Sequence, residues 1–163
     1  ELEAAQVAPL LVEWGIDLGQ PLAPVITEIW DAYMVAWRVE MDRQRYREPS
    51  LPFLIRGATA MRGVDLSDEQ AAAWWRAAWI GAQHFGLQLY PDTLDVLRAL
   101  KEAGVAIAAN TNRPCTSDMF LRDAEAFGFA EYLDHAVCSG DTGYLKPHAS
   151  TFERVLQKLA LPP

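Results

Sequence analysis

Hydrophobic positions in the first half of the chain recur at the three- and four-residue spacing of amphipathic helices. The pattern predicts helices over residues 2–14, 22–46 and 51–62. A further helix opens at Ser67, which forms the pattern of a capping box with Gln70, and its apolar side reaches Phe85. Tryptophans at helical spacing are typical of helix–helix interfaces, although some could line a substrate pocket. We therefore expect residues 1–88 to form a helical domain, whose first helix could belong to its junction with the rest.

The pattern changes after residue 91, where helical periodicity begins to alternate with short apolar runs. It predicts helices over about 92–103 and 116–127, strands over 105–109 and 136–138, and a last helix carrying Phe152, Val155, Leu156 and Leu159. Gly104 and Gly128 stand where helix C-terminal caps are expected. Apolar strands that alternate with helices indicate a parallel sheet covered on both faces. Residues 89–163 are thus expected to form an α/β domain.

Composition excludes several classes of function. Twenty-two acidic against fourteen basic residues give a net charge of −8, so we expect no nucleic-acid partner, in spite of the arginines between residues 38 and 47. No apolar run approaches the length of a membrane span, and no membrane partner is expected. Cys115 and Cys138 form no zinc motif, and a reduced, cytoplasmic location is the default. Composition does not predict an oligomeric state.

Polar residues at the predicted strand ends carry the candidate chemistry. Thr111 and Asn112 follow the first strand, and Lys146, fixed by Pro147, lies in the loop after the second. Because ligands bind beyond the carboxyl ends of parallel strands, these residues are expected at one edge. A hydroxyl, backbone N–H groups and an ammonium together could hold an anion. A lone lysine before a helix would more simply be solvated.

Two segments, "LYPDTLDVLRALKEAGVAIAANTNRP" and "CSGDTGYLKPHASTFERVLQKLALPP", resemble the haloacid dehalogenase-like hydrolases that have a helical cap. The resemblance covers residues 89–163, and residues 1–88 agree with the cap in length, position and helicity. The second motif of this family, Ser or Thr and usually Asn after an apolar strand, selects Thr111 and Asn112. Its third motif, a lysine often followed by proline, selects Lys146.

The resemblance implies a partial Rossmann-like parallel sheet with an α-helical cap. It also implies a phosphatase of a small phosphorylated metabolite, which works through an aspartyl-phosphate intermediate with Mg²⁺ between the anions. Thr111 would bind a phosphoryl oxygen, Lys146 would neutralise nucleophile and phosphate, and Asn112 would complete the phosphate-binding set. Thr111 and Lys146 are the candidate catalytic residues.

Two motifs of the family are missing. No Asp-x-Asp triplet follows an apolar strand, because Asp65 has no such strand before it and Asp92 begins a helix. Gly140-Asp141 precedes the lysine and cannot be the acidic fourth motif. We therefore expect the nucleophile and most Mg²⁺ ligands outside residues 1–163, no metal ligand within them, and an inactive fragment when they stand alone.

Several alternatives stay open. A haloacid dehalogenase shares the fold, although dehalogenases usually have Ser-Asn where Thr111 stands. A non-catalytic binding or regulatory module would have lost the nucleophile, and a purely helical interaction domain could rest on residues 1–88.

The roles of several individual residues are open too. Asp141 either orients Lys146 or solvates its loop, Cys115 is reactive or passive, and His148 needs only a helix-start role. Candidates for substrate contact from the cap, each of which could instead be a surface or packing residue, are Arg56, Arg62, Trp74 and Trp75.

Overall fold

The computed structural model describes residues 1–162, and the chain divides into two compact units. The first contains residues 1–43 and 49–80, and the second contains residues 44–48 and the chain from Gly81 on. Residues 81–88, which the hydrophobic pattern grouped with the helical part, thus belong to the second unit.

The first unit is built from four α-helices, α1 (Leu2–Glu13), α2 (Leu22–Asp42), α3 (Leu51–Ala60) and α4 (Asp68–Ala78). Helix α3 packs against α2 and α4, and α1 packs against the same two helices. The capping box predicted at Ser67 and Gln70 is confirmed, with both reciprocal hydrogen bonds formed. The other predicted helices are confirmed to within about four residues at their ends.

Aromatic side chains pack with aliphatic ones in the core of the first unit. Trp74 and Trp75 are buried, and the ring of Trp75 meets Trp30 and Trp79 edge-to-face at centroid distances of 5.7 and 5.5 Å. These are favourable aromatic geometries. The tryptophan pattern therefore marks a helix interface, as its spacing predicts.

The helix predicted from Ser67 to Phe85 ends earlier, at Ala78. Trp79 is extended, and Gly81 has a φ of +78°, a conformation that few residues other than glycine adopt. A 3₁₀ turn, η1 (Ala82–Phe85), follows in the second unit. The helix thus ends where the backbone becomes extended at Trp79, and Gly81 provides the positive φ immediately before the 3₁₀ turn.

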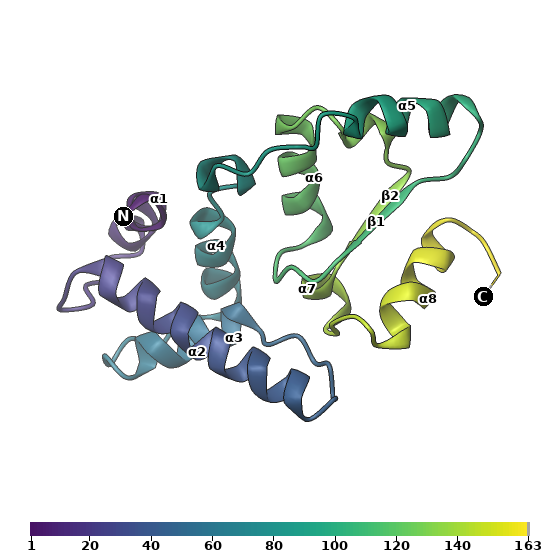
Figure 1. Cartoon of the computed structure of the whole chain (residues 1–163). Helices are drawn as coiled ribbons and strands as arrows, with labels where there is room; N and C mark the ends of the chain where they lie inside the picture. Colours follow the sequence, from purple (N-terminus) through teal and green to yellow (C-terminus); the bar gives the residue numbers. More distant parts are fainter. Residues whose placement is uncertain (163) are drawn as a thin grey trace. The chain divides into compact units, whose positions relative to one another are not determined.

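The second unit is an α/β arrangement around two parallel strands, β1 (Ala108–Thr111) and β2 (His135–Cys138). Their register runs from Ala108 opposite His135 to Thr111 opposite Cys138. Helix α6 (Ser117–Ala126) packs against β2, and α8 (Ala149–Lys158) contacts both strands from the other side (Figure 1). The remaining elements are α5 (Thr93–Glu102), η2 (Ala130–Tyr132) and the short α7 (Ser139–Thr142). The α/β class and the two helix-covered strands agree with the sequence.

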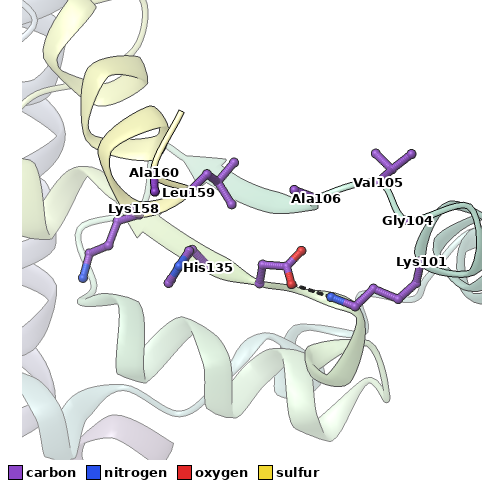
Figure 2. Close-up of a pocket in the computed structure, with 9 residues that line it drawn as sticks. Lys101, Gly104, Val105, Ala106, His135, Lys158, Leu159 and Ala160 are labelled. Atoms are coloured by element: carbon purple, nitrogen blue, oxygen red, sulfur yellow. Dashed lines mark hydrogen bonds and ion pairs between the residues drawn. The ribbon is translucent and has the colours of Figure 1, made fainter. Parts of the chain in front are cut away.

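The first strand begins later than predicted. The pattern placed it over 105–109, but the ladder starts at Ala108 and includes Asn110 and Thr111. Asp134 explains the difference, because its carboxylate accepts the Ile107 N–H at 2.8 Å and its own N–H donates to the Ile107 carbonyl at 2.8 Å. Lys101 in turn pairs with Asp134 (Figure 2). The partner strand, not the apolar run, therefore decides where pairing begins.

Two helices of the second unit carry apolar side chains that stay accessible. No residue of α5 is buried, and Val96 and Leu100 are exposed. Only Thr151 of α8 is buried, whereas Phe152 is about half exposed. Among residues 1–162, no helix combines the length and apolar character needed to cross a membrane.

Candidate functional site

Lys146 is bound to the carboxyl end of β1 at two points. Its Nζ donates to the main-chain carbonyl of Asn110 at 2.6 Å. Its own N–H donates to the Asn112 Oδ1 at 2.6 Å, and its carbonyl accepts from the Asn112 Nδ2 at 3.3 Å. The loop before α8 therefore returns to the end of β1, and two of the three predicted site residues, Asn112 and Lys146, are in direct contact.

Thr111 lies at the same strand end but beside a different feature. The side chain of Asn110 reaches Thr151 of α8 at 3.5 Å, and because side chains alternate along a strand, Thr111 points toward the α6 side. There it lines a hollow of about 360 Å³. The other lining residues are Ala82, Leu87, Gln88, Leu89, Arg113, Phe120, Asp123, Phe127 and Phe129. Lys146 does not line this hollow. The binding of one anion by both Thr111 and Lys146 therefore stays a prediction.

Arg113, which is not among the site residues predicted from the sequence, lines the same hollow as Thr111. Its guanidinium pairs with the buried carboxylate of Asp123 at 3.0 Å. Its carbonyl accepts hydrogen bonds from the Gly140 N–H at 3.1 Å and the Ser139 hydroxyl at 2.9 Å. The available signal was an arginine directly after a strand-ending Thr-Asn, followed by an aspartate on the next helix. This pair fixes the loop that leaves β1.

Asp141 joins the two strand-end loops. Its Oδ2 accepts the Ser117 N–H at 2.9 Å, the Ser117 hydroxyl, and more weakly the Cys138 N–H at 3.4 Å. The carboxylate thus holds the start of α6 against the start of α7. Asp141 has a structural role that neither open interpretation anticipated.

The two cysteines are buried beside this contact between the two strand-end loops, which we call the loop joint. Cys115 and Cys138 are both fully buried, with sulfur atoms 3.9 Å apart. The hydrogen bond with Cys115, together with burial, raises the pKa of the Cys138 thiol above its usual range. This environment fits the passive interpretation of Cys115.

His148 is the N-cap of α8. Its ring accepts the Ser150 N–H, which agrees with the predicted role at the start of a helix.

The first-unit residues that were candidates for substrate contact make ion pairs, hydrogen bonds or core contacts with other residues of the same unit. Arg56 pairs with Asp68 at 2.5 Å. Arg62 donates to Glu28 at 2.6 Å and to the Ala58 carbonyl at 2.6 Å. The hydrogen bond from Arg62 lowers the pKa of Glu28. The two tryptophans, as described above, belong to the core. These contacts fit packing and ion-pair roles.

The described residues do not fit a Mg²⁺ site of their own. Within residues 1–162, no three histidine, cysteine, aspartate or glutamate side chains gather as a metal site would require. Mg²⁺ needs carboxylate oxygens, and the strand-end carboxylate of Asp141 is already used by Ser117.

Comparison with known proteins identifies relatives that are longer than this chain. A stretch of 73 residues, 45% of this chain, is 36% identical to the ribulose-1,5-bisphosphate 5-phosphatase of Halopiger xanaduensis and spans 30% of that protein. Among solved structures, the L-2-haloacid dehalogenase of Xanthobacter autotrophicus is 21% identical, with a TM-score of 0.47 over 85% of this chain and 54% of that one. A defluorinating L-2-haloacid dehalogenase is 20% identical, with a TM-score of 0.48 over 99% of this chain and 63% of that one. The chain thus spans less than two thirds of each of these relatives.

The family comparison covers nearly the whole sequence. The model of the haloacid dehalogenase-like hydrolases matches residues 3–163, which include both units and both strand-end motifs. The chain therefore belongs to the haloacid dehalogenase-like hydrolase family.

Proposed function

We propose that the protein carrying residues 1–163 is a Mg²⁺-dependent phosphatase of a small phosphorylated metabolite. The nucleophilic aspartate, the general acid and most metal ligands would come from outside these residues, since no Asp-x-Asp triplet follows β1 or β2. The observation that carries the proposal is the placement of Lys146. Its ammonium donates to the Asn110 carbonyl near the carboxyl end of β1, and its main chain is bound by Asn112, directly after that strand.

The chemistry of these side chains supports phosphoryl transfer. A lysine ammonium is a compact charge that stabilises a carboxylate and a phosphate brought together. The Thr111 hydroxyl can donate to a phosphoryl oxygen. The phosphatase relative supports a phosphorylated substrate, because its 36% identity extends over 73 residues.

Mg²⁺, when bound, would neutralise charge between nucleophile and phosphate. Because the described residues offer no ligand set, we assign no residue of this chain to the metal and no step to it. The role of this chain is to supply the cation of Lys146 and the hydroxyl of Thr111.

The test is hydrolysis of p-nitrophenyl phosphate and of sugar phosphates by the complete protein, with Mg²⁺ and with EDTA. Lys146→Met should lower kcat/KM by about 100-fold, because one preorganised charge at the reacting group is removed. Lys158→Met, the same change on the exposed part of α8, serves as the matched control and should keep full activity.

Two results would overturn the proposal. Release of chloride from 2-chloropropionate without hydrolysis of phosphate esters would identify a dehalogenase. Absence of both activities in the complete protein would favour a non-catalytic module.

A further inference from the structure

The side-chain amide of Asn112 is bound at both of its ends to the main chain of Lys146. Its Oδ1 accepts the Lys146 N–H at 2.6 Å, and its Nδ2 donates to the Lys146 carbonyl at 3.3 Å. An amide carries one acceptor and one donor group side by side, whereas a carboxylate has acceptors only and an apolar side chain has neither. Asn112 therefore binds the backbone of a residue 34 positions further along the chain.

Lys146 has no regular secondary structure to hold its main chain. It lies between the end of α7 and the start of α8. On one side, the Leu145 N–H donates to the Tyr46 carbonyl at 2.6 Å. On the other side, Pro147 has no N–H to donate. Both main-chain groups of Lys146 itself are bound by Asn112.

The side chain of Lys146 then returns to β1, where its Nζ donates to the Asn110 carbonyl at 2.6 Å. A flexible four-carbon stem separates this ammonium from the backbone, so its position depends on where the backbone is fixed. Asn110 and Asn112 thus hold the two ends of one lysine.

We propose that Asn112 is a positioning residue, which fixes the main chain of Lys146 so that the ammonium stays at the end of β1. Its side chain acts on the lysine and not on the substrate anion. The proposal rests on the proposed function for the role of the lysine. It differs from the ligand-binding role that the family resemblance implies for Asn112.

A double-mutant cycle on the complete phosphatase tests this role. Asn112→Ala should lower kcat by about tenfold or more with little change in KM, because the charge is displaced while the anion keeps its other contacts. In a Lys146→Met background, the same Asn112→Ala change should have no further effect, since a residue that acts through the lysine has nothing left to position. Gln157→Ala, on the exposed part of α8, is the control for removal of an amide.

A ligand-contact role gives the opposite results. Asn112→Ala would then raise KM and the inhibition constant of inorganic phosphate, and its effect would persist undiminished in the Lys146→Met background. Either observation overturns the proposal.

A second measurement needs no activity. Trace acetylation with acetic anhydride, followed by mass spectrometry of peptides, gives the reactivity of each lysine. Lys146 should react more slowly than the exposed Lys158, and Asn112→Ala should raise the Lys146 rate several-fold. The rates of Lys101 and Lys158 should not change, which excludes general unfolding. An unchanged Lys146 rate would overturn the proposal even if the protein proved not to be a phosphatase.

Discussion

The sulfur atoms of Cys115 and Cys138 lie 3.9 Å apart in a fully buried contact between the loop after β1 and the end of β2. A disulfide would require about 2.05 Å, so these are two thiols in contact. The hydrogen bond with Cys115 and burial both raise the pKa of Cys138. A raised pKa keeps this thiol protonated at neutral pH, and a protonated thiol is a poor nucleophile.

We therefore expect neither cysteine to react with Ellman's reagent in the native protein at pH 8, whereas both react at once in denaturant. The measurement is the time course of thionitrobenzoate release with and without guanidinium chloride. Rapid modification of one cysteine in the native protein would show that the loop joint opens or that this thiol is activated, and would contradict the expectation.

The carboxylate of Asp134 should make stability depend on pH. Its pKa is lowered, first by the hydrogen bond from Lys101 and then by the N–H of Ile107. A carboxyl whose folded pKa is depressed stabilises the fold above its ordinary value of about 3.8 and loses this contribution as the pH falls through the lower folded value. The Asp134→Asn variant of the complete protein should thus be less stable at pH 7, and the difference should shrink below pH 4.

Urea midpoints measured from pH 7 to pH 3 check this expectation. Glu153→Gln, the same change of charge on the exposed part of α8, should follow the wild type at every pH. A constant gap between wild type and Asp134→Asn at all pH values would refute the linkage.

Gly140 lies where no side chain fits. A Cβ there would overlap the carbonyl oxygen of Cys115 and come 2.8 Å from its carbon, and both are backbone atoms that cannot turn aside. Gly140→Ala should therefore destabilise the second unit by about 1–3 kcal/mol through overpacking.

Gly57→Ala is the matched control. A Cβ at residue 57 of α3 meets nothing within 4 Å, and alanine favours a helix by about 1 kcal/mol. Thermal denaturation measures both, and equal effects of the two changes would contradict this account.

The helices were predictable because their signals are local. Ser67 and Gln70 lie three residues apart, and the helical spacing of the tryptophans needs no distant partner. The start of β1 was not predictable in this way. It depends on Asp134, 27 residues from Ile107, and on the register with β2. Helix α7 was missed because four residues are too few to show a period.

The candidate site, too, has features that could be predicted from the sequence and features that depend on contacts between distant residues. The arrival of Lys146 at the end of β1 follows from topology, because loops after parallel strands meet at one edge. The bonds from Asn112 to the Lys146 backbone and from Ser117 to Asp141 depend on the path of two loops. No pattern in the sequence encodes that path, and it is here that the structure adds to the resemblance.

Residues 1–163 expressed alone should associate. Two parallel strands form the whole sheet of the described residues, and parallel sheets normally need both faces and both edges covered. Val105, before β1, is 45% exposed, and Val96, Leu100 and Phe152 are also accessible on the flanking helices. Val105→Lys should reduce association, because a charge near a strand edge opposes pairing with another chain. Sedimentation velocity over a concentration series measures both proteins. A soluble wild-type monomer with a single cooperative thermal transition would show that these apolar surfaces and the open edge are tolerated without a partner.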